Sequence, residues 1–304
     1  MIISASRRTD IPARYMPWME RRLAAGYADV PNPFNPRQVS RVDLRLEAVA
    51  ALVLWTRNPE PALAAMERIA GRGYPFVLLL TVTGYPQVLE PAAPPLAQTL
   101  AAIGETARRF GPERIAWRYD PILFSSLTPP EWHVGNFERL LAGLHGSVGR
   151  IIISFADFYP KVIRSLAAVT AASGIAFTDP HEQPETAREL TAALVRIAAE
   201  RGLTVRSCAE KLDLEGAGAA PGACIDARWL SEVTGRAIDV PTDPHQRAAC
   251  RCASSRDIGM YHCCPQGCVY CYANSSAAAA AANYLRHDPD SPQLLPAAGQ
   301  RNIS

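Results

Sequence analysis

Short apolar runs rich in β-forming residues, each followed by a helical pattern, constrain the fold of this chain most. Most of these runs are continuous rather than alternating, as expected for strands buried on both faces. They cover residues 2–5, 50–55, 75–81, 114–118, 150–155, 175–178 and 204–207. Strands and helices that alternate in this way build right-handed βαβ units around a parallel sheet.

Between these runs, apolar residues recur at helical spacing, and we interpret them as core-facing stripes of helices. The stripes are Leu63/Met66/Ile69, Leu96/Leu100/Ile103, Phe137/Leu140/Leu141/Leu144, Val162/Ile163/Leu166/Val169 and Leu190/Leu194/Ile197. Six or seven βα units are too many for a small open sheet. They predict an α/β fold with a full or partial (β/α) TIM-like barrel. A doubly wound open sheet is the alternative, because periodicity alone does not separate the two.

Composition changes along the chain predict three parts. Residues 1–212 form the barrel domain. A Gly- and Ala-rich loop at 214–222 opens a cysteine-rich, cluster-binding segment, 213–287, which we expect to pack on the barrel. Residues 288–304 are rich in Pro and small residues and predict a loosely attached tail. Residues 38–42 predict one extra strand.

Net charge and hydropathy do not indicate a particular class of binding partner. The chain has 304 residues and a formal net charge of +2, which does not call for a polyanionic partner and argues against a large footprint on duplex nucleic acid. Binding of nucleic acid is not excluded. Charged residues at Arg7 and Arg8 come too early for the apolar core of a signal peptide, and no apolar run is long enough to span a bilayer. We therefore expect a cytoplasmic protein without a membrane partner.

Cysteine placement points to metal binding. The chain has 8 cysteines, and most of them are crowded between Cys250 and Cys271. A disulfide framework would instead spread cysteines through a small secreted chain. The spacing Cys264-x3-Cys268-x2-Cys271 predicts a [4Fe–4S] cluster held by three thiolates. A tight loop that donates only three thiolates leaves one iron open to another ligand, like the open position of a catalytic zinc site.

The residues inside this loop suit that role. Pro265 and Gly267 are expected where a loop wraps tightly around a cluster. Tyr270, directly before the third cysteine, provides a ring that can cover the cluster and exclude water. Cys263 is interpreted as a spare, because adjacent thiols seldom ligate the same cluster.

The remaining cysteines form a second candidate set, suited to a closed auxiliary iron–sulfur cluster or to zinc: Cys208, Cys224, Cys250 and Cys252. Two other interpretations stay open. Cys208 and Cys224 can be small buried apolar residues. Alternatively, a structural zinc knuckle can use Cys250 and Cys252 with Cys268 and Cys271.

Polar side chains collect where the predicted strands end, which is where (β/α) barrels place their chemistry. They are Ser4, Ser6, Arg7, Arg8, Asp10, Thr56, Arg57, Asn58, Thr81, Thr83, Arg118, Tyr119, Asp120, Ser154, Asp157, Asp179 and Glu210. Together, Arg7, Arg8, Arg57 and Arg118 predict a rim that binds a carboxylate or phosphate. Simpler roles are a helix cap for Asp10, a helix start at Asn58, and an ion pair between Arg118 and Asp120.

These motifs resemble known families. The three-cysteine spacing with its aromatic residue resembles the cluster motif of radical S-adenosylmethionine (SAM) enzymes, and Tyr270-Cys-Tyr-Ala-Asn resembles spore photoproduct lyase in particular. Over nearly the whole chain, the sequence resembles the family called domain of unknown function 1848. That resemblance rests on Ser6-Arg-Arg-Thr-Asp-Ile-Pro, Trp55-Thr-Arg-Asn-Pro, Trp117-Arg-Tyr-Asp-Pro-Ile and Asp257-Ile-Gly-Met-Tyr.

The resemblance implies that the open iron binds SAM and that one electron cleaves it to a 5′-deoxyadenosyl radical, which abstracts hydrogen from a substrate. The electron donor would be a flavodoxin or a ferredoxin. The substrate is not identified, although the arginine rim suits an anion. We expect Arg118, Asp120 and Tyr272 to be catalytic. The expected cofactor-binding residues are Ser6, Arg7, Arg8, Asp10, Thr56, Arg57, Asn58, Tyr270 and Asn274.

Two features depart from the radical SAM pattern. The cysteine loop follows the last strand rather than the first, and no Gly-Gly-Glu segment follows the second strand. Two alternatives therefore stay open. One is a non-enzymatic iron–sulfur or zinc module for redox or nucleic-acid sensing. The other is a nucleic-acid repair enzyme of the photoproduct-lyase type.

Overall fold

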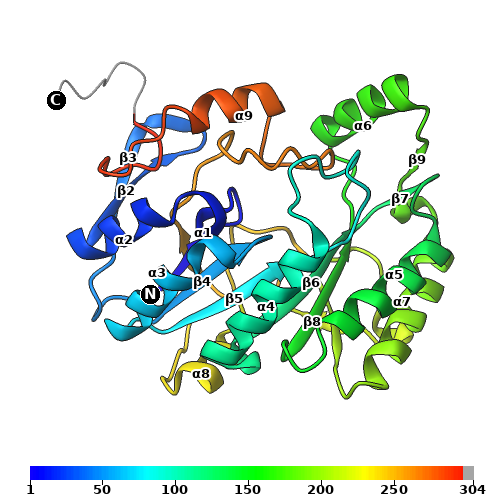
Figure 1. Ribbon diagram of the computed structural model, residues 1–304, viewed down its shortest axis with the longest axis horizontal. Helices are drawn as coiled ribbons and strands as arrows, with labels where there is room; N and C mark the ends of the chain where they lie inside the picture. Colours follow the sequence, from blue (N-terminus) through cyan, green and yellow to red (C-terminus); the bar gives the residue numbers. More distant parts are fainter. Residues whose placement is uncertain (297–304) are drawn as a thin grey trace. The chain divides into compact units, whose positions relative to one another are not determined.

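The computed structural model describes residues 1–296 (Figure 1). It is a mixed α/β structure with an eight-stranded parallel sheet. The strands of this sheet are β1 (Ile2–Ala5), β4 (Ala51–Thr56), β5 (Phe76–Thr81), β6 (Ile115–Ile122), β8 (Arg150–Phe155), β10 (Val205–Cys208), β11 (Ala220–Gly222) and β12 (Ser255–Asp257).

The order of the strands in this sheet is β11-β10-β8-β6-β5-β4-β1-β12. From β1 to β11 the strands are neighbours in chain order, and the last strand, β12, lies parallel to the first, with Ile2 opposite Ser255. A (β/α)₈ barrel has this order. The pairing of β11 with β12 that closure requires is not among the pairs of the described strands. A doubly wound sheet reverses its order near the middle, and this sheet does not, so the order disfavours that alternative.

The α-helices of the described chain follow or separate these strands. They are α1 (Ile11–Arg14), α2 (Met16–Ala25), α3 (Leu63–Gly71), α4 (Leu96–Phe110), α5 (Pro130–Gly143), α6 (Pro160–Ser173), α7 (Pro184–Ala199), α8 (Ala227–Thr234) and α9 (Ala277–Tyr284). Helices α5, α6 and α7 each have a proline in the first turn, where the missing N–H costs no helical hydrogen bond. Figure 1 shows α5 and α7 side by side. Within the described residues, every helix is too short or too polar to cross a bilayer.

Short 3₁₀ turns and two small antiparallel pairs complete the structure. The turns are η1 (Glu60–Ala62), η2 (Pro112–Arg114), η3 (Pro180–Glu182) and η4 (Glu215–Ala217). A largely exposed hairpin joins β2 (Tyr27–Asn32) to β3 (Asn35–Asp43), and β7 (Phe124–Ser125) pairs with β9 (Phe177–Thr178). The extra strand predicted at 38–42 lies within β3 of this hairpin.

The described chain divides into two compact units. The first contains residues 1–78 and 255–267 and everything described from 273 onward. The second contains residues 79–254 and 268–272. The first division lies within β5. The domain boundary predicted at residue 212 stays a prediction.

Six of the seven predicted strands are strands of the large sheet, and all residues of β1 and β4 are buried. The prediction for residues 175–178 was wrong. Only Phe177 and Thr178 form a strand, which pairs antiparallel outside the sheet. Both residues are half-buried. A strand covered on both faces would be fully buried.

The predicted helical stripes are buried most completely in α5 and α7. Ile163 of α6 is the exception, because 50% of its surface is exposed. Val162 and Leu166, four residues apart, face the core of the second unit. Ile163 lies about 100° around the helix from Val162 and therefore points away from that core.

The segment 213–287 contributes β11 and β12 to the sheet. Both strands have three residues and contain Pro, Gly, Ser, Arg or Asp, so no apolar run marks them. The predicted loop at 214–222 therefore ends in a strand.

The tail that we expected to be loosely attached from Asp288 is packed over its described part. The indole N–H of Trp18 donates to the carbonyl of Ser291 at 2.9 Å, and Asp29 N donates to the carbonyl of Pro292 at 2.9 Å. Leu294 and Leu295 are buried. Residues 297–304, the rest of the predicted tail, lie outside the described residues.

Leu294→Ala tests this packing. Leu294 is 1% exposed, so its truncation should lower the free energy of unfolding by about 2–4 kcal/mol, as for other buried leucines. Leu285, which is 85% exposed, is the matched control, and Leu285→Ala should cost less than about 0.5 kcal/mol. Urea unfolding measures both values. Equal, small losses would show that the tail is loosely attached in solution.

Candidate functional site

Asp257 is the last residue of β12, and the loop that carries Cys264, Cys268 and Cys271 (the cysteine loop) follows it. The Asp257 side chain fixes the start of this loop to β1. Its carboxylate accepts hydrogen bonds from Ser4 Oγ at 2.8 Å, Ser6 Oγ at 2.6 Å and the backbone N of Arg7 at 2.8 Å. The backbone N of Gly259 also donates to it, at 2.9 Å. A Cβ atom on Gly259 would clash with Ser6 Oγ, which explains the glycine. Ser6 Oγ and the backbone N of Arg7 therefore hold this loop. The cofactor-binding roles predicted for Ser6 and Arg7 stay predictions.

Asp10 joins three segments of the first unit. Its side chain accepts from Ala13 N at 2.9 Å, which confirms the predicted helix cap, and from Arg57 N at 2.8 Å after β4. Gln266 Nε2, in the cysteine loop, donates to the same carboxylate at 3.4 Å. Burial raises the pKa of Asp10 against these hydrogen bonds. Asp10 is therefore both a helix cap and an anchor for the loop.

The other predicted polar residues of the first unit have local contacts. Thr56 Oγ1 donates to Asn58 O at 2.9 Å, and Asn58 Oδ1 accepts from Glu60 N at 3.1 Å, so Asn58 begins the next helical turn. The Arg7 guanidinium lies 5.6 Å from the ring centre of Trp55, and that of Arg8 lies 5.0 Å from the ring centre of Tyr261. Both arginines therefore make cation–π contacts with aromatic rings.

The first part of the cysteine loop separates the two adjacent cysteines. Cys263 is fully buried, its thiol donates to Met260 O at 3.0 Å, and its carbonyl accepts from Tyr15 Oη at 2.5 Å. Cys264 is half-buried, and its carbonyl accepts from Asn274 Nδ2 at 2.7 Å. His262, just before them, has a left-handed backbone with φ of +60°. The contacts of Cys263 fit its interpretation as a spare.

Two buried acceptors near this part of the loop have no partner among the described residues. They are Gln266 Oε1 and Asn274 Oδ1. Buried polar atoms are nearly always hydrogen-bonded, and leaving one unsatisfied costs about 1–3 kcal/mol. Both atoms can accept a hydrogen bond from a bound molecule.

The second part of the loop, 268–272, is anchored in the second unit. Cys271 N donates to Cys268 O at 3.1 Å, which closes a turn, and Val269 N donates to Leu89 O at 3.1 Å. Tyr270 is buried, its ring centre lies 5.9 Å from that of Tyr85, and its hydroxyl bonds to Glu90.

Tyr272, predicted to be catalytic, follows this turn. It is 47% exposed, and its carbonyl accepts from Lys161 Nζ at 2.9 Å. The catalytic role of Tyr272 stays a prediction.

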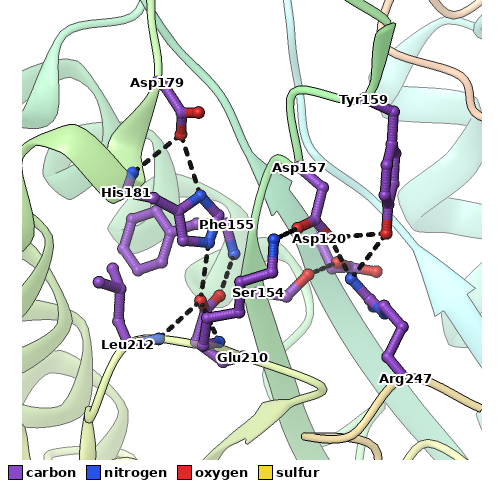
Figure 2. A network of polar contacts seen from close by, with 11 residues as sticks. Asp120, Ser154, Phe155, Asp157, Tyr159, Asp179, His181, Glu210, Leu212 and Arg247 are labelled. Atoms are coloured by element: carbon purple, nitrogen blue, oxygen red, sulfur yellow. Dashed lines mark hydrogen bonds and ion pairs between the residues drawn. The ribbon is translucent and has the colours of Figure 1, made fainter. Parts of the chain in front are cut away.

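The two other residues predicted to be catalytic, Arg118 and Asp120, both lie on β6. Arg118 and Asp120 form an ion pair in which both side chains are largely buried. Ser154 Oγ, from β8, donates to the same carboxylate (Figure 2). Arg118 also donates to Thr81 Oγ1 at 3.2 Å. Asp120 is thus oriented by a cation from its own strand and by a hydroxyl from the neighbouring strand.

Asp157, just after β8, gathers cationic residues from distant segments. Lys211 Nζ lies 2.9 Å from its carboxylate, and Arg247 forms a second ion pair with it. Arg247 also donates to the hydroxyl of Tyr159 at 3.3 Å. Figure 2 shows this cluster next to Ser154 and Asp120.

A histidine between two carboxylates is the part of the site that the sequence did not reveal. His181 Nδ1 lies 2.9 Å from Asp179 Oδ1, and His181 Nε2 lies 3.0 Å from Glu210 Oε1 (Figure 2). Glu210 also accepts from the backbone N of Phe155 at 2.8 Å and of Leu212 at 3.1 Å. The sequence analysis placed Asp179 and Glu210 at strand ends and missed His181, whose signal was its position two residues after Asp179.

These contacts shift both pKa values in the directions that favour an ion pair. The hydrogen bond to Glu210, helped by Asp179, raises the pKa of His181 against the effect of burial. Burial opposes ionisation of Glu210, but His181 and two backbone N–H groups outweigh it and lower the pKa of Glu210. Ala209, directly before Glu210, has a φ of +52°, a left-handed conformation that is unfavourable for alanine and directs the chain at this turn.

Three of the four cysteines predicted as a second set are in contact. Cys208 Sγ and Cys224 Sγ are 3.0 Å apart, and Cys252 Sγ accepts from Ile225 N at 3.4 Å. Hydrogen bonds with Cys224 and Cys252, together with burial, raise the pKa of the Cys208 thiol. Cys250 is half-buried, and its backbone N donates to Arg247 O at 2.8 Å. The contacts of Cys252 favour this set over a zinc knuckle with Cys268 and Cys271.

No cysteine of residues 1–296 forms a disulfide. In the same residues, no three side chains among His, Cys, Asp and Glu have the arrangement of a ready-made metal site. In the cysteine loop, Cys264 belongs to the first unit, whereas Cys268 and Cys271 belong to the second.

Comparison with protein families identifies the chain at the level of a family. The family described as "Domain of unknown function (DUF1848)" matches residues 2–273. The chain belongs to the DUF1848 family. The match includes the strand-end motifs of β1, β4 and β6 and the whole three-cysteine loop. No curated protein matches the chain. The DUF1848 resemblance seen in the sequence is therefore confirmed.

The His181–Glu210 pair of this DUF1848 protein predicts a pH-dependent stability. The raised pKa of His181 gives stability that is complete below its ordinary pKa of 6.5 and is lost as pH rises through the raised value. The lowered pKa of Glu210 gives stability that is present above its ordinary pKa of 4.5 and is lost as pH falls through the lowered value. The pair therefore stabilises most between pH 4.5 and 6.5.

His181→Gln should lower the free energy of unfolding by about 1–2 kcal/mol in that window, after allowance for solvent screening. The deficit should shrink at higher pH. Urea unfolding at several pH values measures it, with the exposed His145→Gln as control. A deficit that does not change with pH would show that His181 stays neutral.

Proposed function

We propose that this DUF1848 protein is an iron–sulfur enzyme of the radical-SAM-like type. Cys264, Cys268 and Cys271 would hold a [4Fe–4S] cluster, and SAM would be the co-substrate. The observation that carries the proposal is the position of the loop. It begins at the carboxyl end of β12, and β12 lies against β1. The loop is thus connected to the edge where parallel α/β sheets place their chemistry.

The residues of the loop fit a cluster. All three proposed ligands are half-buried, whereas the neighbouring Cys263 is fully buried with its thiol bonded to Met260 O. Three thiolates are the donor set of a cluster with one open iron. Gly267 has a φ of +71°, a conformation that a residue with a side chain rarely adopts, and it allows the turn between the first two ligands.

Groups for SAM are also present in the first unit. Gln266 Oε1 and Asn274 Oδ1 are buried acceptors without a partner among the described residues, and the ammonium group of SAM offers N–H donors. Arg8 lies over Tyr261, which precedes the loop, and Arg7 lies over Trp55 of β4. Both carry the charge that a carboxylate requires. When bound, cluster and SAM would supply a 5′-deoxyadenosyl radical that abstracts hydrogen from the substrate.

Residues of the chain itself would hold the loop, exclude water and orient the substrate. Asp257 and Asp10 hold the loop. The buried ring of Tyr270 would exclude water from the turn between Cys268 and Cys271. At the ends of β6 and β8, Arg118 and Ser154 orient the carboxylate of Asp120 to accept a hydrogen bond from the substrate. An anionic substrate and a flavodoxin or ferredoxin as electron donor belong to this proposal. Eight thiols and a reducible cluster are consistent with a cytoplasmic setting.

Anaerobic reconstitution tests the proposal. The protein should bind about four iron and four sulfide ions per chain, and the reduced protein should convert SAM to 5′-deoxyadenosine and methionine. Replacing Cys264, Cys268 and Cys271 by Ala should abolish both results, whereas Cys263→Ala should retain them. Failure to bind iron and sulfide would exclude the cluster. An intact cluster that never cleaves SAM would favour a non-enzymatic iron–sulfur module.

Asn274→Ala tests the proposed acceptor. Loss of one hydrogen bond to a charged group should weaken SAM binding by about 5- to 30-fold, equivalent to about 1–2 kcal/mol. Asn283→Ala is the matched control, because Asn283 Nδ2 also fastens this region, by donating to His262 O at 2.8 Å. Calorimetric titration of the reconstituted variants measures the affinity. Equal affinity in the two variants would remove Asn274 from the SAM site.

A further inference from the structure

We infer that Cys208, Cys224 and Cys252 form a second metal site, for a single thiophilic ion such as Zn²⁺. The site lies entirely within the second unit. It does not depend on the proposed function, because it shares no residue with the three-cysteine loop.

The backbone brings these thiols together from three separate segments. Cys208 is the last residue of β10, and it lies opposite Gly222 of the parallel strand β11. Cys224 follows β11 by two residues. Cys252 is fixed to the same region, because Ala253 N donates to Ile225 O at 2.8 Å and Ile225 N donates to Cys252 Sγ at 3.4 Å. Regular strand pairing and backbone hydrogen bonds therefore place all three.

The distance between the thiols favours a single ion over a cluster. Cys208 Sγ and Cys224 Sγ are 3.0 Å apart. Four ligands at a Zn–S distance of about 2.3 Å in a tetrahedron lie about 3.8 Å from one another, so the pair must separate by less than about 1 Å. A [4Fe–4S] cluster binds each thiolate through a different iron and needs a much wider set. The described residues contain no ready-made metal site. The pair Cys208–Cys224 needs a smaller rearrangement to bind one ion than to bind two separate irons of a [4Fe–4S] cluster.

Burial and charge distinguish this set from ordinary core cysteines. All three side chains are buried, as in closed structural sites. Two cations lie near them: the Arg118 guanidinium is within electrostatic reach of Cys224, and Arg247 is within electrostatic reach of Cys208. Several thiolates around a divalent ion carry a net negative charge, and these arginines, which also pair with Asp120 and Asp157, offset part of it. An apolar core position gains nothing from them.

Cys250 is the nearest candidate for the fourth position along the chain. It precedes Cys252 by two residues and is half-buried. An ion in this site would join the ends of β10 and β11 to the segment at Cys252. The residues next to it, Arg118 and Arg247, orient Asp120 and Asp157. A bound ion would therefore help to fix the two arginines that orient the carboxylates of Asp120 and Asp157.

Cobalt titration in a variant without the cluster ligands tests the inference. The full chain with Cys264→Ala, Cys268→Ala and Cys271→Ala is reduced, freed of metal with a chelator and titrated with Co²⁺ in the absence of oxygen. One Co²⁺ per chain should bind, with the intense sulfur-to-metal absorption of several thiolate ligands, and one Zn²⁺ should displace it. A negative result would not test the proposed three-cysteine cluster, because this variant lacks the ligands of that cluster.

Further substitutions in this variant assign the ligands. Cys208→Ser, Cys224→Ser and Cys252→Ser should each weaken Co²⁺ binding by at least about 100-fold, whereas Cys263→Ser should not change it. Cys252→His separates ligation from packing, because histidine is also a metal ligand. This variant should still bind one Co²⁺, with a weaker sulfur-to-metal absorption. The inference is wrong if no Co²⁺ binds, if the absorption shows no thiolate, or if the three serine variants bind as tightly as the Cys263→Ser control.

Discussion

The carboxylate of Asp257 is the contact on which the arrangement of this protein depends. Asp257 is the last residue of β12, the last strand of the sheet in chain order. Its carboxylate accepts hydrogen bonds from Ser4, Ser6 and the backbone of Arg7 at the end of the first strand. Residues about 250 positions apart are thereby held side by side. Under the proposed function, this contact accounts for the different place of the cysteine loop in the chain order. The cysteine loop follows the last strand of the chain, but that strand is a direct neighbour of the first.

Each part of the three-cysteine loop has its own support. In the first unit, Asp10 and Asn274 bind Gln266 and the carbonyl of Cys264. In the second unit, Tyr270 and Val269 fasten the turn of Cys268 and Cys271 to Glu90 and Leu89. The unsatisfied acceptors occur in the first part. The side chains of Asp120, Asp157 and His181, by contrast, each have ion-pair or hydrogen-bond partners within the second unit. We assign ligand binding to groups that lack partners, and rigidity to groups that have them.

The sequence predicted what repeats locally and missed what depends on distant partners. Continuous apolar runs predicted β1, β4, β5, β6, β8 and β10, because strands buried on both faces have no polar alternation. Strands β11 and β12 carry no such run, since three polar or small residues suffice when the neighbouring strand supplies the hydrogen bonds. His181 was missed because its second partner, Glu210, comes from another strand end. Asp10 is the predicted cap and also an anchor for the cysteine loop that the sequence did not predict, since the cap uses Oδ1 and leaves Oδ2 for Arg57 and Gln266.

Electron paramagnetic resonance of the reduced, reconstituted protein tests the proposed open iron most directly. Without SAM, the account predicts the signal of a reduced [4Fe–4S] cluster that is lost when Cys264, Cys268 or Cys271 is replaced. Addition of SAM should change the g-values of that signal, because a ligand reaches the open iron. A signal that SAM leaves unchanged, or one that persists without these cysteines, would contradict the account.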